Sequence, residues 1–148
     1  MRLDRYELAA SRKLTTFEFV SVGPKGRIPK LIQYDATNLA HVFNLSFGDK
    51  NAETGEIDDS TVSNNGDSEQ VLATVVATVY AYTDKYPDRW IHATGSTKAR
   101  TRLYRMGITK YYEEAINDFD IFGRINEDWE EFMLGVNYDA FVVRRKSK

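Results

Sequence analysis

Hydrophobic and polar residues alternate along much of the first half of the chain, which is typical of half-buried β-strands. The alternation is clearest where Phe43, Leu45 and Phe47 fall on one face of a predicted strand. A turn signal, Gly-Pro-Lys-Gly at 23–26, separates two extended segments and predicts a hairpin. The first half is therefore expected to form a β-meander, with strands at 14–22, 27–34, 42–47 and 56–63.

The longest helical pattern begins at Asp67 and ends before Pro87. We expect Asp67 to cap the first turn, because Gln70 follows three residues later as in a capping box. Small residues recur on one flank and would let another backbone approach closely. This small-residue ridge consists of Ala73, Ala77 and Ala81. A broad apolar arc next to the ridge predicts that the helix is buried against the sheet. The arc contains Val71, Leu72, Val75, Val76, Val79, Tyr82 and Tyr86.

A short strand, a small-residue turn and a basic helix follow the long helix. The strand is predicted at 89–94, the turn at Gly95 and the end of the helix at Gly107. Spacing along the basic helix predicts a core-facing side made of Ala99, Leu103 and Met106. A basic stripe about 100° away consists of Lys98, Arg102 and Arg105. The remaining predicted elements are a helical stretch at 109–117 and strands at 119–122 and 138–145.

The turn and the basic stripe are the strongest candidate for a ligand site. Backbone N–H groups at a helix start and the positive end of the helix dipole attract phosphate groups. An ordinary strand-to-helix turn with a serine or threonine cap and solvated arginines would have the same sequence. The stripe could instead contact a nucleic-acid backbone or a protein partner. The candidate ligand-binding residues are Gly95, Ser96, Thr97, Lys98, Arg102 and Arg105.

Length and composition predict that these elements form one globular domain, 1–148. Nine Tyr, eight Phe and two Trp supply enough aromatic surface for a packed core, and the absence of cysteine excludes disulfides and thiolate metal sites. Because no apolar stretch is long enough to span a membrane, we expect a cytoplasmic protein. The formal net charge of −2 argues against nucleic-acid binding by overall attraction but allows a local basic patch.

No residue pattern identifies a catalytic residue, a cofactor or a metal site. His41 and His92 have no second histidine or cysteine at ligand spacing. A single imidazole near a strand is more often a hydrogen-bonded structural residue than part of a catalytic triad. The sequence therefore leaves open whether the chain catalyses a reaction.

The predicted order, β-β-β-β-α-β-α-β-β, resembles the later part of the N-acetyltransferase superfamily over residues 42–145. The sequence Gly-Asp-Ser-Glu-Gln-Val-Leu at 66–72 is similar to that family's glycine loop and following helix, and 99–108 is similar to its later helix. Members of that superfamily bind acyl-coenzyme A across a splayed mixed sheet. The resemblance assigns no general acid, because Leu103 rather than Tyr104 aligns with the family's tyrosine. Asp67 also puts a carboxylate where the pyrophosphate would lie, so the resemblance implies a fold and no more.

We therefore predict an α/β (α+β) domain with a twisted, mainly antiparallel, N-acetyltransferase-like sheet. The whole chain also resembles a group of small bacterial proteins of unknown function. The leading hypothesis is a cytoplasmic bacterial protein that binds a phosphorylated, nucleotide-like or acyl-coenzyme A-like ligand at the strand-turn-basic-helix segment. The alternative hypothesis is a non-enzymatic interaction module that contacts a protein or nucleic-acid partner through the arginine-rich helix.

Overall fold

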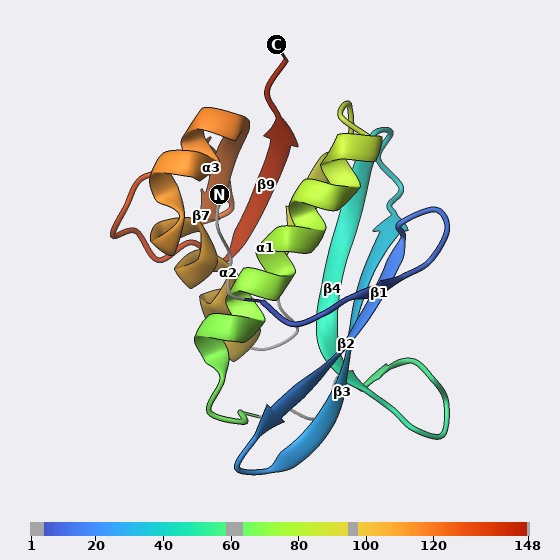
Figure 1. The fold of residues 1–148 in the computed structure, drawn as a ribbon. Helices are drawn as coiled ribbons and strands as arrows, with labels where there is room; N and C mark the ends of the chain where they lie inside the picture. The colour runs from blue at the N-terminus through green and yellow to red at the C-terminus, as the bar shows by residue number, and fades with distance from the viewer. Residues whose placement is uncertain (1–4, 59–63, 95–97, 148) are drawn as a thin grey trace.

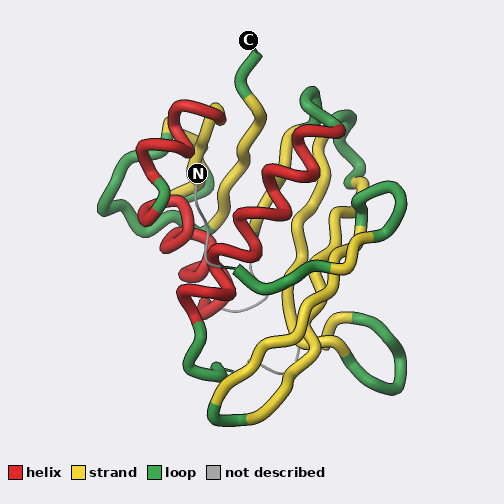
Figure 2. Tube along the Cα trace, in the orientation of Figure 1, coloured by secondary structure: helices red, strands yellow, loops and turns green. Residues whose placement is uncertain are grey.

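A computed structural model describes residues 5–58, 64–94 and 98–147 of the chain (Figure 1). Within these residues the predicted fold class is confirmed, because nine strands form a mainly antiparallel open sheet that is accompanied by three helices (Figure 2). The first half contains β1 (Ala9–Ala10), β2 (Thr16–Gly23), β3 (Gly26–Ala36), β4 (Val42–Lys50) and β5 (Ile57–Asp58). The second half contains α1 (Ser68–Lys85), β6 (Trp90–Ala93), α2 (Lys98–Lys110), α3 (Tyr112–Asp118), β7 (Phe119–Ile125), β8 (Asp128–Glu131) and β9 (Ala140–Arg145).

The strands follow the order β1-β2-β3-β4-β6-β9-β7-β8, and β5 pairs with β4 beside this path. Of the strand pairs in the described residues, only β4 with β6 is parallel. The last strand, β9, lies between β6 and β7 and is antiparallel to both. The sequence pattern did not predict β1, which has two residues, or β8, whose four residues are all exposed.

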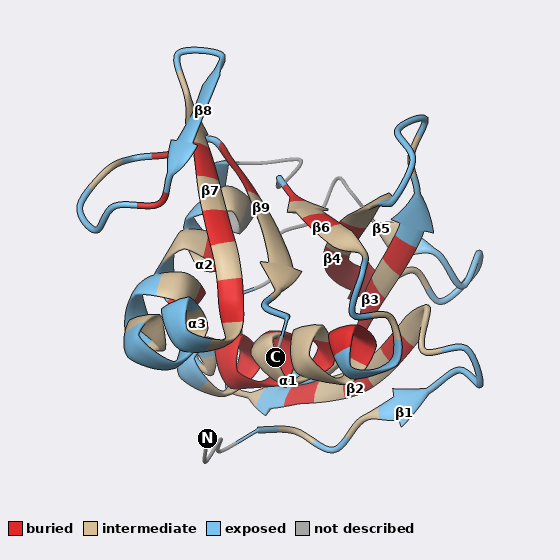
Figure 3. Ribbon diagram, turned by 90° about the horizontal axis from the view of Figure 1, so that it is seen from above, coloured by how far each residue is buried: buried red, intermediate tan, exposed pale blue. Residues whose placement is uncertain are grey.

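The sheet curves around α1, so that β2 and β9 lie on different sides of the helix (Figure 3). One continuous core joins the inner face of the sheet to α1 and to Tyr104 of α2. At its centre the rings of Tyr34 and Tyr82 stack at 4.1 Å, and the Tyr34 hydroxyl forms a 2.8 Å hydrogen bond with the Thr78 hydroxyl. Stacking of two buried aromatic rings adds to the stabilisation that comes from burying their surface.

The long helix lies where the sequence predicts it, but two details of the prediction are wrong. Asp67 occupies the cap position without a side-chain capping bond to the described helix, because its carboxylate binds other partners described below. The ridge is buried at Ala73 only, whereas Ala77 and Ala81 line an open cleft between α1 and α3. The three helices share the same side of the sheet, so α1 meets α3 at its flank instead of meeting the sheet along its whole length.

β4 continues three residues beyond the predicted segment 42–47, to Lys50. Asp49 in this extension is 8% exposed, lies opposite Lys30 of β3 and forms an ion pair with it. A buried charge is tolerated when its partner is buried beside it, and Lys30 is itself 4% exposed. Reasoning from polarity alone assigned Asp49 to a loop and ended the strand too early. Of the fourth predicted strand, Ile57–Asp58 form β5, and 59–63 lie outside the described residues.

The basic helix α2 also differs from its prediction, because it passes through Gly107 and ends at Lys110. A Cβ atom on Gly107 would lie 3.2 Å from Leu72 of α1, so the glycine allows close helix packing instead of ending the helix. This contact turns the helix so that Tyr104 is 7% exposed and Met106 is 40% exposed. The prediction that Met106 faces the core is therefore wrong.

We expect Gly123→Ala to destabilise the fold by about 2–3 kcal/mol. The new Cβ atom would lie 2.4 Å from the Tyr138 ring, which crosses β7 at this point. The ring cannot easily move, because the Tyr138 hydroxyl donates to Glu130 Oε2 at 2.8 Å and accepts from the Met133 N–H at 3.0 Å. Urea unfolding of the variant and of the unsubstituted chain measures the difference.

Gly107→Ala is the control for this substitution. Its Cβ atom meets the end of the flexible Leu72 side chain, and alanine has the higher helix propensity, so a change between zero and about 1 kcal/mol of stabilisation is expected. Equal destabilisation by both substitutions would contradict the specific clash with Tyr138.

Candidate functional site

The carboxyl end of β6 is the place where the topology favours a ligand site. β4 and β6 pair over four residues, and Leu45 with Ala93 is the last pair. Beyond it, β4 runs on to Lys50 while β6 ends, and the chain continues towards α2. In open α/β sheets, ligands bind outside the carboxyl ends of parallel strands, where successive connections lead to different sides. Here β4, which precedes β6 in the chain, lies on one side of β6. β7, which follows β6 in the chain, lies on the other side, beyond β9.

The structure describes half of the six predicted ligand-binding residues. Gly95, Ser96 and Thr97 lie outside the described residues. The side chains of Lys98 and Arg102 are exposed on α2. Arg105 is half-buried and donates from Nη1 to the Asn137 side-chain oxygen at 2.6 Å. The three basic residues therefore share one helix, but only Arg105 has a fixed partner in the described residues.

Polar groups in the segment just before β9 form hydrogen bonds with Thr94, which follows β6, and with Arg105 of α2. The Thr94 hydroxyl donates to the Asp139 backbone oxygen at 3.0 Å, and Arg124 of β7 donates from Nε to the Asp139 carboxylate at 2.9 Å. Asn137, which binds Arg105, is two residues from Asp139. Sequence reasoning missed the partners of Arg105 and Thr94 because they lie 32 and 45 positions away, and no motif marks them. Because Asn137 is neutral, its contact holds Arg105 in place without cancelling its charge.

His92 lies on the outer face of β6, away from the helices. Its Nδ1 atom is 3.1 Å from the Asn44 side-chain oxygen, and the Asn44 amide nitrogen donates to the Ser46 hydroxyl at 3.2 Å. The prediction of a hydrogen-bonded imidazole beside a strand is therefore confirmed. Burial lowers the pKa of His92, and the nearby Arg124 charge lowers it further. Neutral imidazole is thus the favoured form in the folded protein.

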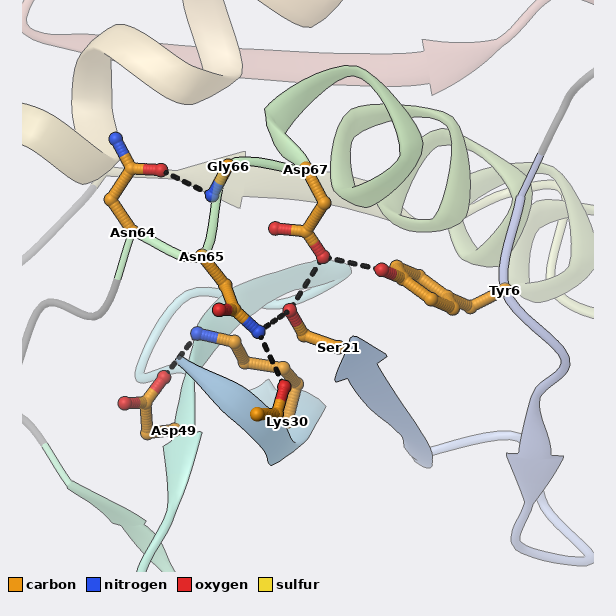
Figure 4. Close-up of polar contacts among 9 residues, drawn as sticks. Tyr6, Ser21, Lys30, Asp49, Asn64, Asn65, Gly66 and Asp67 are labelled. Atoms are coloured by element: carbon orange, nitrogen blue, oxygen red, sulfur yellow. Dashed lines mark hydrogen bonds and ion pairs between the residues drawn. The ribbon is translucent and has the colours of Figure 1, made fainter. Parts of the chain in front are cut away.

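The glycine loop before α1 binds the β2–β3 hairpin through a polar network (Figure 4). The Asp67 carboxylate accepts hydrogen bonds from the Tyr6 and Ser21 hydroxyls, both at 2.5 Å. The Asn65 amide donates to Ser21 Oγ at 3.2 Å and to the Gly26 backbone oxygen at 2.9 Å. Ser21 and Asn65 are almost fully buried. The network therefore fixes the loop and the N-terminal segment against β2, and it explains why Asp67 does not cap α1.

An apolar cavity of about 100 Å³ lies on the other side of α2, between the helices and the sheet. Its sheet wall includes Leu45 and Ala93, the last pair of the parallel strands, and its helical wall includes Leu103 and Tyr104. At about 24 cal/mol per Å³, an empty cavity of this size costs roughly 2 kcal/mol of stability. Lys98, Arg102 and Arg105 do not line the cavity.

Comparison with known proteins assigns the chain to a family. A model described as a family of unknown function (DUF6934) matches residues 2–146. The chain belongs to this family. The predicted similarity to proteins of unknown function is thereby confirmed, whereas neither a curated protein nor a solved structure matches the chain. A separate check of the helices in the described ranges found none with the length and apolar character needed to span a membrane.

We expect Tyr6→Phe to destabilise this family member by about 1–2 kcal/mol, because it removes a hydroxyl that donates to the Asp67 carboxylate and accepts from the Val22 N–H at 3.0 Å. The aromatic stack of Tyr6 on Phe19, at 5.4 Å, would be kept. Thermal unfolding measures the loss. The control is Tyr111→Phe, since the described residues give that hydroxyl no hydrogen bond, and a similar loss in both variants would contradict the role of the network.

The lowered pKa of His92 predicts how stability depends on pH. The unfolded chain takes up a proton near the usual histidine pKa of about 6.5, while the folded chain resists it, so stability falls as the pH drops below that value. His92→Gln should therefore lose less stability than the unsubstituted chain between about pH 7 and about pH 5. Unfolding curves at each pH measure this difference.

His41→Asn is the matched control, because His41 is exposed and has a positive φ that asparagine tolerates. It removes a histidine without removing a buried imidazole. An equal effect of the two substitutions would show that burial of His92 is not the cause.

Proposed function

We propose that the chain is a cytoplasmic bacterial protein that binds a phosphate-bearing small molecule, nucleotide-like or acyl-coenzyme A-like, at the carboxyl end of β6. The observation that carries this proposal is the early end of the parallel pairing. β6 ends where Ala93 pairs with Leu45 of β4, whereas β4 continues to Lys50. The parallel pairing therefore stops at the carboxyl end of β6, just before the chain reaches the basic helix α2. The absence of cysteine is in keeping with a reducing compartment.

The charges on α2 support an anionic ligand. Lys98 and Arg102 are exposed and one turn apart, so both can reach the same group in solution. Arg105 lies a further turn along and is held by a neutral amide. Arginine and lysine bind phosphate through charge-assisted hydrogen bonds, which are about twice as strong as neutral ones. Asp139 is the nearby acid, and its carboxylate already accepts a hydrogen bond from Arg124.

The acyl-coenzyme A-like class within this proposal rests on the resemblance in element order alone. A helix connects the parallel strands β4 and β6, and the last strand enters between β6 and β7. The N-acetyltransferase superfamily, which the element order resembles, binds acyl-coenzyme A across a splayed mixed sheet. The Asp67 carboxylate is occupied by Tyr6 and Ser21, so it does not cover the first turn of α1. Nothing in this argument requires that a reaction is catalysed.

One observation favours the alternative function of an interaction module. Met106 is 40% exposed on the same helix as the basic stripe, and it lies four residues after Arg102. A helix that binds a protein partner places apolar side chains on its contact face. A protein or nucleic-acid partner would contact this outward surface without needing a pocket.

The test is a binding titration with coenzyme A, ATP and pyrophosphate, followed by the double variant Lys98→Ala and Arg102→Ala. We expect at least one of the three to bind, and the double variant to lose about tenfold or more in affinity, because two charged contacts disappear. Calorimetry measures the binding, and a thermal shift checks it independently.

The matched control is Arg12→Ala with Lys13→Ala, which removes the same charge from exposed residues beside the other end of α1. The proposal fails if none of the probes binds, or if the control weakens binding as much as the α2 variant. A short RNA that binds while all three small probes fail would support the interaction module.

A further inference from the structure

We propose that the apolar cavity beneath α2 is a binding site for a short uncharged hydrocarbon group, such as a small acyl or alkyl chain. Its lining consists of aliphatic residues, aromatic residues and one glycine, and it draws on three helices and four strands. A known 150 Å³ apolar cavity holds benzene, so about 100 Å³ holds roughly four carbon atoms. The proposal does not depend on the phosphate site, because the basic stripe does not line this cavity.

The chemistry of the walls selects against polar ligands. The Tyr80 hydroxyl, at one end, donates to the Asp118 carboxylate at 2.6 Å and is therefore engaged. Tyr104 also has an interaction partner. Away from the half-buried Tyr111, a hydroxyl, amide or charged group brought into the apolar space would lose its water without gaining a hydrogen bond. Apolar cavities of this kind also stay free of water, so a hydrocarbon group displaces nothing that binds well.

Small residues keep the space open. Protein interiors are packed as densely as organic crystals, and few contain voids larger than a water molecule. Here Ala93 of β6, Gly107 of α2 and Ala115 of α3 stand on three different walls of the cavity, where larger apolar residues would fill it. Small residues on three separate elements thus leave one space unfilled. Efficient packing would fill this space, whereas a ligand site requires it.

One wall of the cavity gives a route of entry. Val76, Ile108, Tyr111 and Ala115 line the cavity and are only half-buried, so this wall lies close to the surface. They come from α1, α2, the link between α2 and α3, and α3 itself. Small rotations of these side chains would admit a ligand without unfolding either helix, because exposed and half-exposed side chains change rotamer quickly.

The experiment uses n-butane as the probe and 1-propanol, which has the same number of heavy atoms, as its polar counterpart, added to the full chain in sealed samples. We expect butane to raise the melting temperature by about 1–2 °C in butane-saturated buffer, and 1-propanol to raise it less, because its hydroxyl must give up its hydrogen bonds to water. In methyl NMR spectra, butane should shift the signals of Val76, Val79 and Leu103, which line the cavity.

Ala115→Leu should fill the cavity, raise the melting temperature without butane and abolish the butane effect. Ala77→Leu is the matched control, because Ala77 lines the outer cleft and not the cavity, and it should keep the full butane shift. Ala115→Val, with a smaller side chain, tests the same point if leucine prevents folding.

The inference is overturned if butane does not stabilise the unsubstituted chain, or if folded Ala115 variants keep the complete butane effect. Lys98→Ala with Arg102→Ala should retain the butane effect, so failure of the phosphate site and failure of the cavity site are distinguishable.

Discussion

The parallel pairing of β4 with β6 is the constraint on which the rest of the structure depends. Two parallel neighbours cannot be joined by a tight turn, so the chain must cross from one end of the sheet to the other, and α1 makes that crossing. The helix is stable because it buries its apolar face against the curved sheet, where Tyr82 stacks on Tyr34. Once α1 is fixed, the end of β6 and the start of α2 are fixed as well.

Periodicity predicted the elements that bury one face, and it failed where tertiary partners decide the outcome. The alternation at Phe43, Leu45 and Phe47 places them on the inner face of β4, as the core confirms for the last two. Asp67 looked like a helix cap, but the hydroxyls of Tyr6 and Ser21 lie far away in the sequence and hold its carboxylate instead. The β4 extension was missed for the same reason, because the buried partner of Asp49 lies on another strand.

The order of the elements around the candidate site was predictable, but the partners of its residues were not. The basic helix α2 does follow β6, as the pattern indicated, whereas the predicted turn at 95–97 lies outside the described residues. The contacts of Arg105 with Asn137 and of Thr94 with Asp139 depend on β9 entering the sheet next to β6, and spacing along the chain carries no information about that step. The inner face of α2 was also misjudged, because Gly107 serves close packing against α1 and turns Tyr104 inwards.

The distribution of charge bears on which anion the basic helix can hold. The whole chain carries a formal charge of −2, so it has no long-range attraction for a polyanion. Nucleic-acid binding without such attraction needs many phosphate contacts, each of which weakens as salt rises. The basic stripe of α2 offers Lys98, Arg102 and Arg105, which suffice for one phosphate or pyrophosphate group but not for a long backbone track. This charge distribution is consistent with the small phosphorylated ligand that we propose, rather than with a strand of nucleic acid.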